Sequence, residues 1–221
     1  AYNVAIGYNA GAAVTTGIQN TLLGSQVGDA LTTGSYNVAI GFQALSSEDS
    51  GGKNVAIGRL ALKDLDAGAD AYNTAIGFNA GENVSTGAHN TLIGGLAGDS
   101  LTTGSYNVAI GKGALSTEDA HSYNVAIGLN ALTSQNAGAD AYNTAIGYKA
   151  GAAVTTGINN TIVGGLAGDA ITTGTANVAL GYRALTASLD GDFNTALGYK
   201  ALEDYEDGDG NGHNTAVGSQ S

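Results

Sequence analysis

The chain has 221 residues, of which 36 are Gly, and it contains no Pro, Cys, Met or Trp. Seven basic and 19 acidic residues give a net charge of −12, the wrong sign for binding phosphate backbones or anionic membrane surfaces. The lack of Cys excludes disulfides, thiolate metal sites and a cysteine nucleophile. No apolar run reaches the roughly 20 residues of a membrane span. We therefore expect no nucleic-acid partner and no membrane insertion of this segment.

A short repeat of the form Asn-(Val/Thr)-x-x-Gly covers the whole chain. It begins at Asn3, Asn20, Asn37, Asn54, Asn73, Asn90, Asn107, Asn124, Asn143, Asn160, Asn177, Asn194 and Asn214. The spacing is 17 residues, except that every fourth interval is 19 or 20 residues. Four repeats therefore make a super-repeat, at residues 3–72, 73–142 and 143–213, with a final partial copy at 214–221. We expect a single tandem-repeat domain over residues 1–221.

The first repeat starts with a predicted strand. Residues 2–7 read Tyr-Asn-Val-Ala-Ile-Gly, a short apolar segment with β-branched residues, bounded by turn residues. The same segment recurs in every repeat, while no apolar set persists at helical spacing. Thirteen such strands, stacked at about 4.8 Å, predict an all-β parallel β-solenoid with coils of 17–20 residues.

Two positions of the repeat never vary, and both have structural explanations. The Asn side chains would lie one strand spacing apart in adjacent coils, where their amides can bond along the stack. The Gly four residues later would provide a positive φ or a close approach of two backbones.

The strand is apolar on both sides. The third residue after Asn is always Ile, Leu or Val, and we expect it to point into the coil. The second residue after Asn is Ala, Leu or Ile, and alternation would turn it outward. A strand that is apolar on both sides is normally covered on both sides, so the second side predicts another chain.

A third position shows compensation in volume. The eighth residue after Asn is Gly in some repeats, where Val, Leu or Ile follows three residues later, as with Gly28 and Leu31. It is Leu in the others, as at Leu45, where the later residue is mostly polar, as at Glu48. We therefore expect one slot in the core to be filled by the residue eight positions after Asn in some repeats and by the residue eleven positions after Asn in others. The reason is that a close-packed core needs the same side-chain volume in every coil.

The last long turn resembles the start of a calcium loop. Asp207, Asp209 and Asn211 alternate with Gly residues, but the twelfth position, which should be a bidentate Glu, is Gly218. The alternatives are an incomplete calcium cage and a solvated acidic turn. No cofactor is required by the sequence, and calcium is the one candidate.

The remaining acidic and Thr-rich segments have two interpretations each. Acidic residues in the loops are expected to be solvated, or else to form a cation-dependent surface; they include Glu48, Asp49, Asp64, Asp66, Asp70, Glu118, Asp119, Asp140, Asp190 and Asp192. Thr pairs such as Thr32 and Thr33 suggest an ice-binding array, although two repeats with the pair alternate with two that lack it.

Aromatic residues stand just before Asn and just after the repeat Gly. The ones after Gly are candidate receptor or glycan contacts, with packing between coils as the alternative: Tyr8, Phe42, Phe78, Tyr148, Tyr182 and Tyr199. Catalysis finds no support, because none of His89, His121 and His213 has a neighbouring triad arrangement. We predict that the chain is not an enzyme.

Repeats such as Asn-Val-Ala-Ile-Gly-Tyr-Asn-Ala at residues 3–10 and Asn-Thr-Ala-Leu-Gly-Tyr-Lys-Ala-Leu at 194–202 resemble the head repeats of trimeric autotransporter adhesins and related tail-fibre-like surface proteins. This resemblance spans the chain and implies a left-handed parallel β-roll assembled as a homotrimer. It also implies a fibre or adhesin at the cell surface, outside the cell or on a virion, which attaches to a host or surface receptor. The 17-residue repeat is longer than is usual in adhesin heads, and residues 1–221 show no heptads of an adhesin stalk.

Overall fold

The computed structural model describes residues 2–205 and 212–221. Contacts between residues divide the chain into two compact units, 1–107 (unit 1) and 108–221 (unit 2). Unit 1 holds β1 (Val4–Ile6), β2 (Thr21–Leu23), β3 (Val38–Ile40), β4 (Val55–Ile57), β5 (Thr74–Ile76) and β6 (Thr91–Ile93). Unit 2 holds β7 (Val108–Ile110), β8 (Val125–Ile127), β9 (Thr144–Ile146), β10 (Thr161–Val163), β11 (Val178–Leu180), β12 (Thr195–Leu197) and β13 (Thr215–Val217).

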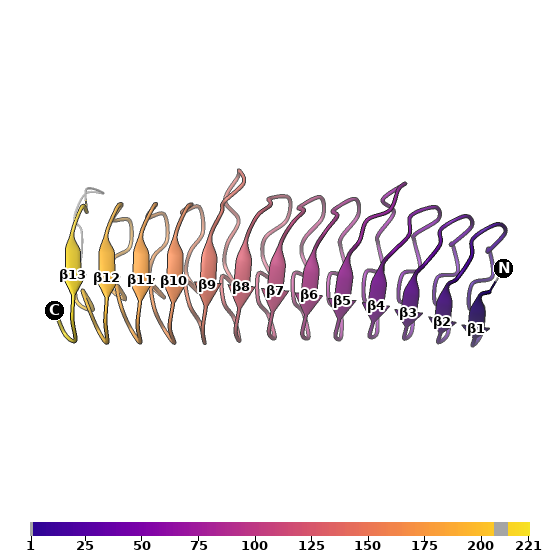
Figure 1. The fold of residues 1–221 in the computed structure, drawn as a ribbon, viewed down its shortest axis with the longest axis horizontal. Coiled ribbons are helices and arrows are strands. Elements are labelled where there is room, and N and C mark those ends of the chain that lie inside the picture. The colour runs from indigo at the N-terminus through magenta and orange to yellow at the C-terminus, as the bar shows by residue number, and fades with distance from the viewer. Residues whose placement is uncertain (1, 206–211) are drawn as a thin grey trace. The chain divides into compact units, whose positions relative to one another are not determined.

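Within each unit, every strand pairs in parallel with the strand of the next coil (Figure 1). The register is one repeat, so Val4 faces Thr21 in unit 1 and Val108 faces Val125 in unit 2. Among the described residues no helix is long and apolar enough to cross a membrane. The predicted all-β parallel β-solenoid is confirmed for each unit, whereas a single domain over the whole chain stays a prediction.

The side of the strand that faces the core is opposite to the one predicted. The second residue after Asn is completely buried in the inner coils, as at Leu22, Ala39 and Ala109. The third residue lies partly or largely exposed, as at Leu23 and Leu180. The physical reason is the buried Asn, since alternation places the residue two positions later on the same inner side. The predicted inward position of the large aliphatic residue is therefore wrong.

The Asn side chains do connect consecutive coils, mainly by bonds to the backbone. The backbone N–H of Asn20 donates to Oδ1 of Asn3 (2.8 Å), and Nδ2 of Asn20 donates to the carbonyl of Gly34 (2.9 Å). Unit 2 repeats this arrangement, with Asn160 donating its N–H to Oδ1 of Asn143 (2.7 Å). Asn20 thus bonds its neighbouring coil and closes its own, which satisfies buried amides that would otherwise be costly.

The repeat Gly is required for both predicted reasons. Gly7 has a φ of 135°, and a Cβ on it would lie 2.1 Å from the carbonyl oxygen of Gly24. No side chain fits that approach of two backbones. The same geometry occurs in unit 2, where a Cβ on Gly128 would lie 2.2 Å from the carbonyl oxygen of Gly147.

The residue eleven positions after Asn is buried in both kinds of repeat, as at Leu31 and Glu48, so one slot filled from two directions stays a prediction. Leu31 and Leu45 are both completely buried, although they stand at different positions of their repeats. A Cβ on Gly11 would lie 2.6 Å from Cδ1 of Leu22, so the Gly makes room for its neighbours. Leu45 has a φ of 53°, a left-handed conformation that costs about 1–2 kcal/mol. Burying a Leu side chain contributes about 1.5–3 kcal/mol, which offsets this strain.

The longer coils carry protruding loops. The extra residues lie between β4 and β5 in unit 1 and between β8 and β9 in unit 2, and both loops extend beyond their neighbours (Figure 1). In these loops, a Cβ on Gly68 or Gly138 would meet no atom within 4 Å.

Candidate functional site

The outward side of the strands forms a partly exposed surface of aliphatic and Thr side chains in each unit, which we call the outer strand face. It consists of the residues one and three positions after each repeat Asn. Its more exposed members are Val4, Ile6, Leu23 and Ile76 in unit 1 and Ile146, Val178, Leu180, Leu197 and Val217 in unit 2. These positions hold only Val, Thr, Ile and Leu, so the face carries no charge in a chain with a net charge of −12.

The outer strand face is continuous from coil to coil within each unit. It spans three residues, or about 10 Å, over six coils, or about 29 Å, in unit 1. That makes roughly 290 Å² in unit 1 and roughly 340 Å² in the seven coils of unit 2. The largest apolar patch of a typical monomer measures about 300–600 Å², and such patches are often functional.

One edge of this face carries the residues that directly precede Asn, which we call the leading row. Tyr72 and His89 stack with ring centroids 5.3 Å apart, and His89 and Tyr106 stack at 4.8 Å. In unit 2 Tyr123 stacks on Tyr142 at 5.0 Å. The predicted packing of aromatic residues between coils is confirmed for these rings, which remain partly exposed.

The residues five positions after Asn, which we call the trailing row, contain the predicted receptor contacts. All six of these aromatic residues are exposed: Tyr8, Phe42, Phe78, Tyr148, Tyr182 and Tyr199. Cations lie over several of these rings, with Arg59 5.2 Å from the centroid of Phe78 and Lys149 5.6 Å from that of Tyr148. Their contact with a receptor stays a prediction.

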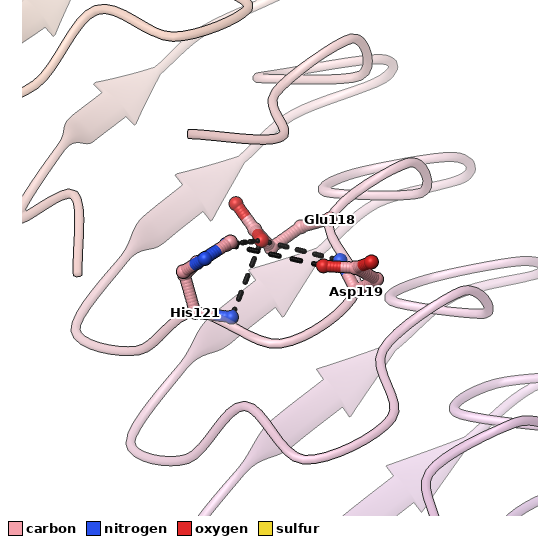
Figure 2. A group of neighbouring side chains, drawn as sticks. All are labelled: Glu118, Asp119 and His121. Carbon is pink, nitrogen blue, oxygen red and sulfur yellow. Dashed lines mark hydrogen bonds and ion pairs between the residues drawn. The ribbon is translucent and has the colours of Figure 1, made fainter. Parts of the chain in front are cut away.

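A group of side chains surrounds the buried carboxylate of Glu118 in unit 2 (Figure 2). Glu118 has a completely buried side chain, and its Oε1 lies 2.6 Å from Nδ1 of His121. Oε1 also accepts the backbone N–H groups of Asp119 (3.1 Å) and His121 (3.3 Å), and Oε2 accepts the amide of Gln135 (3.1 Å). The Gln135 carbonyl in turn accepts Nδ2 of Asn143 (2.9 Å), which joins the cluster to the Asn bonds.

A second buried carboxylate, Glu48, occupies unit 1. Its Oε1 accepts the N–H of Gly51 (2.6 Å), and its Oε2 accepts the N–H of Ala67 (3.2 Å). Burial raises the pKa of Glu48 above its ordinary value; the backbone N–H groups oppose this shift, and the charge of Asp66 adds to it. The expectation that the acidic loop residues are solvated is therefore wrong for Glu48 and Glu118. Both stand eleven residues after Asn, where Leu31 and Val84 point inward, and that shared spacing was the signal of burial.

Among the described residues, two clusters each contain three potential metal ligands whose ligand atoms lie within 4.8 Å of one another. One consists of Glu118, Asp119 and His121, and the other of Glu48, Asp49 and Asp66. In the first group the oxygens of Glu118 already accept four N–H groups, so a cation would have to displace them. The predicted calcium ligands Asp207, Asp209 and Asn211 lie outside the described residues.

The Thr pairs divide into a bonded and an exposed member. Thr32 Oγ1 donates to the carbonyl of Asp49 (3.1 Å), and Thr172 Oγ1 donates to that of Leu189 (2.8 Å). Thr33 and Thr173 are exposed. In these pairs one hydroxyl bonds the next coil and the other faces the solvent. Ice binding stays a prediction.

No protein-family model, curated protein or solved structure matches this chain. The likeness to adhesin and tail-fibre repeats therefore rests on the repeat residues alone. The three His residues have structural contacts, since His89 and His213 stack on aromatic rings and His121 bonds Glu118. The absence of catalysis stays a prediction.

Proposed function

We propose that this chain is a non-enzymatic structural and adhesive segment of an extracellular or virion fibre. In this proposal it forms a left-handed β-roll and assembles as a homotrimer, which attaches to a receptor on a host or other surface. The observation that carries the proposal is the outer strand face, an uncharged surface that repeats once per coil.

A second copy of the chain fits this face better than an unrelated partner. The strands that form the face recur at about 4.8 Å, and only a surface with the same period can contact every coil in the same way. In each unit the face is a strip roughly 10 Å wide that has this period along its whole length. Coils that meet their copies along this face would form a stiff and multivalent assembly. Three copies of each weak contact then provide avidity for a receptor.

Light scattering coupled to size-exclusion chromatography tests the assembly. We expect three chains per particle at micromolar concentration. Replacing Ile146 and Leu180 by Glu should dissociate the particle, because two charges would be buried in the interface. The double variant Thr156→Glu and Thr173→Glu, which adds the same charge on exposed residues away from the face, should remain trimeric. A monomeric wild-type protein at this concentration would overturn the proposed assembly.

A further inference from the structure

The basic residues of unit 2 gather at one corner of its coils. Residues 108–221 contain only four Lys and Arg residues against 11 Asp and Glu residues. All four stand five or six positions after the repeat Asn, in or beside the trailing row: Lys112, Lys149, Arg183 and Lys200. We call this row, with Tyr148, Tyr182 and Tyr199, the trailing corner. A row of cations in an acidic unit can attract an anionic partner.

Cations and aromatic rings are interleaved along the trailing corner. The Lys149 Nζ lies 5.6 Å from the ring centroid of Tyr148, and the Lys200 Nζ lies 5.7 Å from that of Tyr199. The Tyr182 and Tyr199 rings stack at 5.7 Å and remain about half exposed. The backbone holds these side chains in place, because Lys149 and Arg183 have a φ of 54° and donate their N–H groups to the carbonyls of Leu129 and Gly165.

The corner has a period of two coils over much of its length. Lys112 belongs to the coil of β7, Lys149 to that of β9 and Arg183 to that of β11, so successive cations stand about 10 Å apart along the stack. Between Tyr148 and Tyr182 the trailing row has Gly165, where a Cβ would meet only ring carbons of Tyr182, at 3.6 Å or more. The small residue leaves space between two aromatic side chains.

Part of this positive charge is neutralised within the chain. Glu203 is shared by Arg183 (3.3 Å) and Lys200 (3.0 Å). Asp169 faces Lys149 and Arg183, and burial raises its pKa, against which the two cations act. Four cations thus meet two carboxylates, and the corner keeps an excess of positive charge. Nε of Arg183 is buried and makes no hydrogen bond in the part of the chain that the structure describes.

We propose that the trailing corner of unit 2 binds an extended anionic polysaccharide whose acidic group recurs on every second sugar. Exposed Tyr rings pack against the C–H faces of sugar rings, and Lys and Arg pair with carboxylate or sulfate groups. A two-sugar repeat of an extended chain approximates two coil spacings. Nucleic acid fits less well, because its charges recur about every 3.4 Å along each strand of a duplex. This inference rests on the proposed attachment function and names its ligand.

Calorimetric titration with hyaluronan oligosaccharides, which carry a carboxylate on every second sugar, tests the site. We expect hyaluronan to bind more tightly than a neutral N-acetylglucosamine hexamer, and chondroitin sulfate to show whether sulfate adds to carboxylate. Lys112→Gln with Lys149→Gln should weaken hyaluronan binding about tenfold, the loss of roughly 1.4 kcal/mol. Lys53→Gln with Lys63→Gln, which removes the same charge from unit 1, should leave it unchanged. Equal weakening by both double variants, or no preference over the neutral hexamer, would overturn the proposal.

Aromatic variants separate stacking from charge alone. Tyr182→Leu should weaken hyaluronan binding several-fold, while Tyr142→Leu in the leading row should not. Retained affinity in Tyr182→Leu would contradict the stacking, and equal competition by a single-stranded oligonucleotide would favour nucleic acid over polysaccharide. A trimer that does not bind hyaluronan overturns this inference alone. A monomer that binds it overturns the proposed assembly and supports the site.

Discussion

Glu48 in unit 1 and Glu118 in unit 2 occupy the same position of the repeat, 70 residues apart, and both are completely buried. Glu118 has two side-chain donors, His121 and Gln135, in addition to two backbone N–H groups. Glu48 receives backbone N–H groups only, because Gly51 and Leu65 stand where unit 2 has His121 and Gln135.

The difference teaches how a solenoid tolerates a carboxylate in its core. A buried carboxylate is costly unless hydrogen bonds or an opposite charge compensate it. Unit 2 supplies two further hydrogen-bonding side chains by changing two residues that meet only in the folded coil. Unit 1 leaves the carboxylate with a raised pKa and with the nearby Asp66, where unit 2 has the neutral Asn136.

The largest effect is expected from Glu118→Ala. The variant leaves His121 and the Gln135 amide without their partner in a buried network, which should cost about 3–5 kcal/mol of unfolding free energy. Glu48→Ala removes an equal volume but orphans only backbone N–H groups, for a cost of about 1–3 kcal/mol. Urea unfolding of both variants measures the difference. A larger loss in Glu48→Ala would reverse the comparison.

A double-mutant cycle in unit 2 measures how far His121 and Gln135 depend on each other in stabilising Glu118. His121→Gly and Gln135→Leu give unit 2 the residues of unit 1, and each should destabilise the fold. Because both side chains bond the same carboxylate, their effects should depart from additivity by about 0.5–3 kcal/mol. The cycle is read from four urea midpoints at one pH. Strict additivity would show that His121 and Gln135 act independently.

The pH dependence of stability should reveal Glu48. Its raised pKa means that the folded state binds a proton more readily than the unfolded state does, so stability falls as the pH rises from the ordinary value of 4.5 through the higher folded value. At a pH below this range Glu48 is protonated in both states, so the free-energy cost of burying its charge is absent. Glu48→Gln should therefore be relatively most stabilising at pH 7 and lose its advantage near pH 4. The check is the melting temperature of both proteins across this range, and parallel curves would contradict the assignment.

The smallest effect is expected from Asp66→Asn, which gives unit 1 the residue of unit 2. Removing this exposed charge lowers the pKa of Glu48 slightly, because the Coulomb repulsion from Asp66 is weaker than the effect of burial. Stability at pH 7 should increase by less than about 1 kcal/mol. The matched variant Asp64→Asn, whose residue pairs with Lys63 at 3.0 Å, should not stabilise the protein.

Much of the fold was predictable because repetition makes each position visible many times. The Gly column, the strand segment and the burial of Leu31 and Leu45 all follow from residue types that recur at one spacing. The buried carboxylates were not predicted, because Glu in a loop is ordinarily solvated. Glu48 and Glu118 stand eleven residues after Asn, at the same position as Leu31. This spacing indicates that they are buried once the structure shows that Leu31 points inward.

The sequence by itself determined the number of coils, the length of each coil and the two-sided apolar character of the strands. It did not determine which side of a strand faces the core, because Ala39 and Ile40 are both apolar and alternation fits either choice. The tertiary structure decided this. Closure of the coil brings each Asn beside the Asn of its neighbour, the bonds between them require burial, and the residue two positions later is buried with them. The larger aliphatic side chains are thereby left on the outside, where the outer strand face arises.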